Sequence, residues 1–172
     1  VAATIFAYVD GAYLRPLGLP NDGGFVRLFT TSKTSPQGLF TYDEYVALRE
    51  QSGSLSDMAT IHHRGLYSRR GAWLDSLMCR VVSRNYFSLL GISPALGRFF
   101  DEKDGLRGQP VAVISHAMWQ RRFGADPNVV GKTVSGRELV IIGVAPPSFG
   151  GLWRESPADL WCPTETWELW DR

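Results

Sequence analysis

The stretch PVAVISHAMWQRRFGADPNVVGKTV, residues 110–134, predicts a strand, a helix and a turn in succession. Its first five residues suit a short strand that is buried on both faces. Ser115 is placed to cap a helix that runs to Phe123, and Gly124 stands where such a helix would end. The Asp-Pro pair that begins at Asp126 then starts a turn. This order of elements predicts a domain of the α+β class.

The segments next to this stretch continue the pattern. After it, residues 132–146 predict a β-hairpin whose turn lies at Ser135 and Gly136, with a second arm rich in β-branched side chains. Before it, Ser83 is placed to cap a short helix that Gly91 would close.

The first half of the chain predicts further strands and one well-marked helix. Residues 25–29 alternate as in a strand, and Thr41 and Glu44 form a T-x-x-E capping box that starts a helix. The runs 55–67 and 73–82 predict two strands joined by a turn.

Length and composition describe an ordinary globular chain. Its 172 residues suit one domain or two small lobes, and 44% of them are hydrophobic. The net charge is only +1, so the chain lacks the positive field of a dedicated nucleic-acid binder. No apolar run reaches about 18 residues, so no segment is expected to span a bilayer unaided.

The sequence VVGKT, residues 129–133, looks like part of a phosphate-binding loop. A Walker A loop requires glycine five positions before Gly131, where this chain has Asp126. Strand-like residues follow Lys132, whereas a phosphate loop is followed by a helix N-terminus. We therefore interpret these residues as a turn and expect no cofactor.

Two pairs of neighbouring residues are candidates for catalysis or metal binding. Ser115 and His116 lack the G-x-S-x-G surroundings of a nucleophile elbow, and helix capping accounts for Ser115. His62 and His63 are adjacent on a predicted strand, so their rings point to opposite faces and cannot bind one ion. We expect no catalytic centre and no metal site. A hydrolase would require one of these pairs to meet a carboxylate in a pocket.

Arg121 and Arg122 stand beside Trp119 and Phe123, a combination that also occurs on nucleic-acid-binding surfaces. Arginine at a helix C-terminus equally balances the helix dipole, and the two aromatic residues are spaced to share a helix face in a core. The near-neutral charge favours the second interpretation, with no nucleic-acid partner.

Cys79 and Cys162 lie 83 positions apart, without a spacing typical of zinc. Sequence does not fix the Cα separation that a disulfide needs, so a disulfide and two free thiols both stay open. We favour two buried thiols.

Seven segments, taken in order, resemble one family. They are YLRPLGLP, FTYDEYVALRE, VVSRNYFSLLGISPALGRFF, PVAVISHAMWQRRFG, DPNVVGKTV, VIIGVAPPSFGGL and DLWCPTETW. Together they cover nearly the whole chain, and they are similar to the periplasmic core domain of MacB-like ABC-transporter permeases. The likeness is stronger to the permease-only members of this group.

The resemblance implies a two-lobed α+β domain. A porter-like α/β lobe would comprise about residues 15–82 and 148–172, and an inserted mixed α/β lobe about residues 83–147. Residues 1–14 would be the outer end of a first transmembrane helix.

The resemblance also implies a non-catalytic role on the periplasmic side of an inner-membrane permease. The domain would couple ATP hydrolysis by a cytoplasmic ABC ATPase subunit to export or to conformational work in the envelope. Its partners would be its own transmembrane helices and a second permease copy or half. The best-known members also engage a periplasmic adaptor protein and an outer-membrane channel.

Two alternatives stand beside this reading. One is a mechanotransmission module that regulates an envelope enzyme or handles lipoproteins, and the other is a hydrolase-type enzyme. Trp153, Trp167 and Trp170 are candidate interaction residues because tryptophan is common at interfaces, with core packing as the alternative for each.

Overall fold

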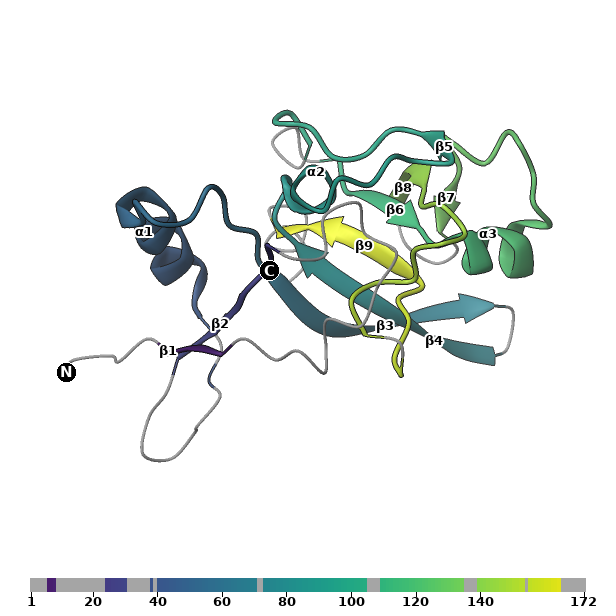
Figure 1. Ribbon diagram of the computed structural model, residues 1–172. Helices are drawn as coiled ribbons and strands as arrows, with labels where there is room; N and C mark the ends of the chain where they lie inside the picture. The colour runs from purple at the N-terminus through teal and green to yellow at the C-terminus, as the bar shows by residue number, and fades with distance from the viewer. Residues whose placement is uncertain are drawn as a thin grey trace. The chain divides into compact units, whose positions relative to one another are not determined.

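The computed structural model describes residues 6–8, 24–30, 38, 40–70, 73–104, 109–134, 139–153 and 155–164. The chain divides into two compact units, Val1–Met58 and Ala59–Arg172, and Figure 1 labels the helices and strands of both. Within the described ranges, no helix has the length and apolar character needed to cross a membrane.

The described residues of the first unit form a two-stranded sheet and one helix. β1 (Phe6–Tyr8) pairs antiparallel with β2 (Arg27–Phe29). Of the predicted segment 1–14, only β1 lies within the described residues.

Helix α1 (Tyr42–Gln51) begins with the predicted capping box. The Thr41 hydroxyl accepts a hydrogen bond from the Glu44 backbone N–H (3.3 Å), and the Glu44 carboxylate accepts one from the Thr41 N–H (2.8 Å). The buried Tyr45 donates its hydroxyl proton to the Met58 carbonyl (3.2 Å). Both predictions for this segment, the helix and its cap, are confirmed.

The second unit is built on one mixed sheet, to which the described residues contribute seven strands. They are β3 (Ile61–Arg70), β4 (Trp73–Val82), β5 (Leu96–Gly97), β6 (Val111–Ile114), β7 (Thr133–Val134), β8 (Leu139–Val144) and β9 (Leu160–Pro163). Their order is β3-β4-β9-β6-β8-β5, and β7 pairs with the start of β8. This mixed sheet with few helices confirms the predicted α+β class. The arms of the predicted hairpin, β7 and β8, are paired, while its turn lies outside the described residues.

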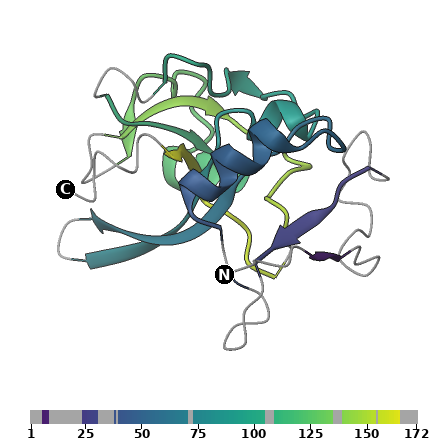
Figure 2. The same ribbon diagram turned by 90° about the vertical axis from the view of Figure 1, so that its left-hand side faces the viewer.

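β3 and β4 form a long antiparallel hairpin, as the sequence predicts. Residues 79–82 of β4 also pair with β9. In the described part of the chain, the rest of β4 pairs only with β3, and this end of the hairpin extends beyond the other strands (Figures 1 and 2). Both boundaries of the first arm are wrong: β3 begins at Ile61, not at Leu55, and ends at Arg70, not at Tyr67.

β9 lies inside the sheet, although it is the last described strand in the chain. It runs parallel to β4 and antiparallel to β6, and Figure 1 shows it in yellow between them. All four of its residues are buried. β9 is therefore hydrogen-bonded on both sides.

Apolar side chains of the sheet and of helix α3 (His116–Phe123) form the core. β6 is buried at every position, as its apolar run predicts. The core cluster comprises Leu66, Leu77, Cys79, Val81, Ala112, Ile114, Met118, Val129, Val134, Leu139, Ile141, Val144, Leu160 and Cys162. Trp119 and Phe123 pack against it, which confirms them as core residues.

Of the two short helices in this unit, α3 ends as predicted and α2 (Tyr86–Leu89) does not begin as predicted. Gly124 and Gly91 adopt the left-handed backbone that closes a helix. However, Asn85, not Ser83, is the N-cap of α2. The Ser83 hydroxyl instead accepts from the Thr60 N–H (3.0 Å) and donates to the Asn85 side chain (2.8 Å), so a tertiary contact uses the predicted cap.

Two glycines face each other where β5 meets β8. Gly97, with φ of +67°, is in register with Gly143. A Cβ at Gly97 would lie 2.3 Å from the Ile142 carbonyl oxygen, and one at Gly143 would lie 2.2 Å from the Arg98 carbonyl oxygen. Only glycine at both positions allows this close approach of the two strands, which places Arg98 over the end of β8.

Candidate functional site

Ser115 and His116 have structural surroundings. The Ser115 hydroxyl accepts a hydrogen bond from the Met118 N–H (3.1 Å), and Ser115 is buried. His116 lies edge-on to Trp119, with 5.1 Å between the ring centroids. Ser115, the only candidate nucleophile of the pair, thus uses its hydroxyl to cap α3.

His62 and His63 differ in exposure, as alternation along a strand predicts. His62 is half-buried, and burial, followed by the charge of Arg64, lowers the pKa of its imidazole. His63 is exposed, with its ring 4.3 Å from that of Trp153. Within the described ranges, no three residues of the types that ligate metals come together.

The VVGKT segment is a turn leading into β7, as predicted. Gly131 has φ of +91°, and the Lys132 ammonium forms an ion pair with Asp126. Asp126 also accepts from the Asn128 N–H (2.9 Å). In a phosphate-binding loop, this lysine would contact the phosphate. Here the carboxylate of Asp126 occupies that place.

The arginines at the end of α3 lie at its negative pole. Arg121 forms an ion pair with Asp159 (2.6 Å), and the second Asp159 oxygen accepts from the Met78 N–H (2.9 Å). This pair ties α3 to the segment before β9.

Cys79 and Cys162 are free thiols and fully buried, with 3.5 Å between their sulfur atoms. Cys79 is in register with Leu160, and Val81 with Cys162, so the cysteines lie diagonally across β4 and β9. Burial, followed by the contact with Cys79, raises the pKa of the Cys162 thiol. The favoured prediction of two buried thiols is confirmed.

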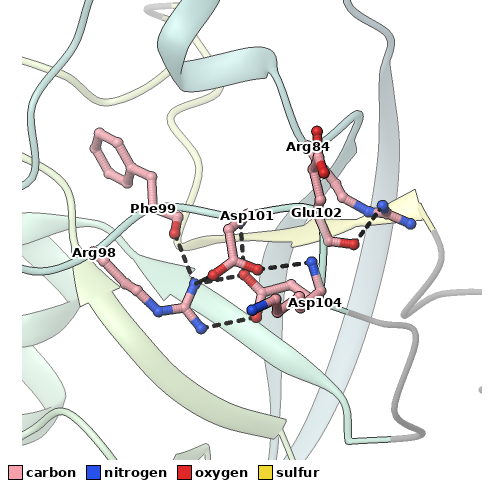
Figure 3. Close-up of polar contacts among 7 residues, drawn as sticks. Arg84, Arg98, Phe99, Asp101, Glu102 and Asp104 are labelled. Atoms are coloured by element: carbon pink, nitrogen blue, oxygen red, sulfur yellow. Dashed lines mark hydrogen bonds and ion pairs between the residues drawn. The ribbon is translucent and has the colours of Figure 1, made fainter.

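Figure 3 shows a polar loop that follows β5, residues 98–104. The Arg98 guanidinium donates to both oxygens of Asp104 (2.6 and 2.9 Å) and to the Phe99 carbonyl (3.0 Å). The Asp101 N–H also donates to Asp104 (2.8 Å). Nearby, Arg84 donates to the Glu102 carbonyl (2.9 Å).

Asp104 is a structural carboxylate. Its side chain is only 6% exposed, and burial by itself raises its pKa. Hydrogen bonds from Arg98 and the Asp101 N–H, together with the charges of Arg98 and Arg84, outweigh burial, so the pKa lies below its usual range. With three donors on its two oxygens, Asp104 holds the loop closed and is poorly placed to act as a base or as a metal ligand.

An aromatic cluster lies where β4, α2 and β9 meet. Phe87 stacks on Phe99 (3.9 Å between centroids), Phe149 stacks on Trp161 (5.6 Å), and Tyr86 lies edge-on to Phe87 (5.2 Å). The guanidinium of Arg80, in register with Trp161, lies 5.6 Å from the Trp153 ring. Trp153 is half-buried, whereas Trp167 and Trp170 lie outside the described residues.

Sequence reasoning missed Arg98, Asp104 and Arg80. Opposite charges six positions apart across a loop are a weak signal for the first pair, and nothing in the sequence marks Asp104 as buried. Arg80 gives a clearer signal, since it is a charge inside the apolar run LMCRVV of a predicted strand.

Comparison with known proteins is consistent with this architecture. The fold resembles that of the periplasmic region of MacB from Actinobacillus actinomycetemcomitans (17% identity, TM-score 0.59, 78% of this chain and 59% of that chain). It also resembles the extracellular domain of the noncanonic ABC-type transporter YknZ from Gram-positive bacteria (18% identity, TM-score 0.59, 75% of this chain and 65% of that chain). The chain thus spans less than two thirds of each structure. No curated protein matches it.

The fold is therefore of the class found in extracytoplasmic domains of ABC-type transporters. The sequence matches the MacB-like periplasmic core domain over residues 1–171, and the chain belongs to that family. The resemblance carried by the seven segments is confirmed, and the chain is a periplasmic domain of a MacB-like ABC-transporter permease.

Proposed function

We propose that this domain is a non-catalytic transmitter within an ABC-type permease. In this account, a cytoplasmic ATPase subunit drives the permease between two states, and the domain carries that change to a partner on the periplasmic side. The observation that carries the proposal is the place of β9 inside the sheet.

β9 is well placed to transmit a displacement. It is hydrogen-bonded to β4 on one side and to β6 on the other, and its four residues are buried. Moving β9 alone would break both ladders, and close-packed interiors transmit strain instead of absorbing it. A pull on the segment that follows β9 would therefore move the sheet as a body.

The candidate catalytic side chains support a non-enzymatic role. Ser115 caps α3, His116 contacts Trp119, and His63 contacts Trp153. Each contact explains its residue by packing or capping, without a reaction.

The division into two lobes, at residues 82/83 and 147/148, is part of this proposal. The porter-like lobe would hold β3, β4 and β9, and the inserted lobe would hold β5 to β8. The boundary between the lobes would then lie between β9 and β6 of the same sheet. Residues 1–14 and the segment with Trp167 and Trp170 would lead to the membrane. A second permease copy or half, a periplasmic adaptor protein and an outer-membrane channel are the proposed partners.

Crosslinking in the native host tests the proposal. The full-length permease is crosslinked through this domain, beside a matched strain whose ATPase subunit cannot hydrolyse ATP, and captured proteins are identified by mass spectrometry. We expect a second permease copy and an envelope partner, captured in amounts that depend on ATP hydrolysis. An adaptor with an outer-membrane channel would identify efflux, and a lipoprotein carrier or cell-wall enzyme would identify mechanotransmission. Capture of cytosolic proteins or nucleic acid alone would contradict the proposal.

A further inference from the structure

Arg80 is a buried charge in the middle of an apolar region. It lies on β4, is only 1% exposed and is followed by the buried residues Val81 and Val82. Burying an isolated charge is costly unless the charge is paired. Burial lowers the pKa of Arg80, but the guanidinium of arginine stays protonated in proteins.

The hydrogen bonds among the described residues satisfy only some of the N–H donors of the Arg80 guanidinium. Nη2 donates to the carbonyl oxygen (2.6 Å) and the hydroxyl (3.0 Å) of Ser156, which are both neutral groups. Nη1 is buried, and among the described residues it has no hydrogen-bond partner. Within the described part of the chain, no carboxylate forms an ion pair with Arg80, and the groups that act on its pKa are Tyr86 and Cys79.

Two more buried donors lie in the same region. Within the described part of the chain, the indole N–H of Trp161 and the hydroxyl of Tyr86 are buried and neither forms a hydrogen bond of good geometry; these residues are 0% and 2% exposed. Arg80 and Trp161 are in register on neighbouring strands, so their side chains leave the same face of the sheet. Burial raises the pKa of Tyr86, whereas the charge of Arg80 and a contact with the Trp161 indole lower it, so both groups lie near the Tyr86 hydroxyl.

We propose that Arg80 Nη1, Trp161 Nε1 and Tyr86 Oη form a binding site for a small monovalent anion of the halide or nitrate class. Such an ion would accept from all three donors and would neutralise the guanidinium. It would link β4, α2 and β9, the strand on which transmission is proposed to depend.

The charge distinguishes this assignment from a buried water. A water molecule could accept from two of the donors, but it carries no charge and would leave the Trp153 ring as the main compensation for the guanidinium. The stacked rings of Phe149 and Trp161 and the ring of Trp153 bound the region, which favours a small ion over a bulky one.

Thermal unfolding of the full 172-residue chain tests the site in solution. The unfolding temperature is measured in sodium chloride, bromide and gluconate at constant ionic strength. Gluconate is the control for an anion too large to enter. We expect the unfolding temperature to rise with the logarithm of the chloride or bromide concentration above the dissociation constant, by roughly 3 to 6 °C at ten times that constant. Equal unfolding temperatures in the three salts would overturn the proposal.

Variants assign the effect to these residues. Arg80→Met should abolish the halide dependence, while Arg121→Met, at a side chain that is 59% exposed, should retain it. Tyr86→Phe keeps the ring and removes only the hydroxyl, so it should raise several-fold the halide concentration at which the unfolding temperature begins to rise, and it remains informative if Arg80→Met does not fold. A halide response unchanged in both Arg80→Met and Tyr86→Phe would contradict the site.

Crystals grown in bromide give the direct answer. We expect an anomalous difference peak within hydrogen-bonding distance of Arg80, Trp161 and Tyr86. A water without anomalous signal there, or a carboxylate from elsewhere in the chain, would overturn the assignment.

Discussion

The core around β6 and β8 and the loop from Arg98 to Asp104 are both part of the second unit, but different forces hold them. The core is apolar, with Ile114 and Ile141 fully buried, and dispersion and the hydrophobic effect stabilise it. The loop depends on charge-assisted hydrogen bonds to one nearly buried carboxylate. The core should therefore respond to lost volume, and the loop to lost charge.

The largest effect is expected in the core. Ile114→Ala should destabilise the domain by about 4 kcal/mol, because it removes buried methylene and methyl groups and leaves a cavity. Urea unfolding measures the loss. The control Val130→Ala, at a residue that is 44% exposed, should stay within about 0.5 kcal/mol of wild type. Equal losses in both variants would contradict the assignment of the core.

Removing the charge of the loop should have a smaller effect. Asp104→Asn keeps the size of the side chain but weakens its hydrogen bonds with Arg98, for an expected loss of about 2 kcal/mol in urea unfolding. The matched control is Asp101→Asn, whose carboxylate is 51% exposed and should cost less than about 1 kcal/mol. A larger loss for Asp101→Asn would show that the wrong carboxylate was chosen.

The pH dependence should separate the two regions further. The pKa of Asp104 is lower in the folded protein than its ordinary value of about 4, so its contribution is complete above that value and is lost as pH falls through the folded pKa. The stability difference between wild type and Asp104→Asn should shrink as pH falls from about 5 to about 3. The difference between wild type and Ile114→Ala should change little over this range, and unfolding curves at several pH values compare the two. A constant difference for Asp104→Asn would contradict the argument.

The smallest effects compare two caps of the same kind in different surroundings. Ser115→Ala should cost about 1.5 kcal/mol, because it leaves the buried Met118 N–H without a partner. Thr41→Ala should cost about 0.5 kcal/mol, because its cap is exposed and water can replace the hydroxyl. Chemical denaturation measures both, and a costlier Thr41→Ala would show that burial does not determine the value of a cap.

The sequence predicts the parts of this fold that depend on neighbours in the chain. Thr41 and Glu44 cap α1, Ser115 caps α3, and the apolar run of β6 is buried on both faces. In each case the partner is within four residues or the environment is uniform, so the local pattern is sufficient.

The parts that the sequence does not predict depend on residues far apart in the chain. The sequence predicts Ser83 as a helix cap, but its hydroxyl accepts a hydrogen bond from the Thr60 N–H instead. Arg80 meets Trp161 only because β9 returns beside β4. Asp104 is buried because the loop folds back so that this residue meets Arg98. The sequence of residues 101–104, which is rich in charges, does not predict this burial.

The most direct test of the central claim is the distance between two copies of this domain in the assembled permease. Val130→Cys provides an exposed site for a spin label, while Cys79 and Cys162 are fully buried and should not be labelled. Electron–electron double resonance would compare the nucleotide-free permease with an ATP-bound form that cannot hydrolyse ATP. The transmission account predicts that the distance distribution shifts between these states. The same distribution in both, in a permease whose unmodified ATPase is active, would contradict it.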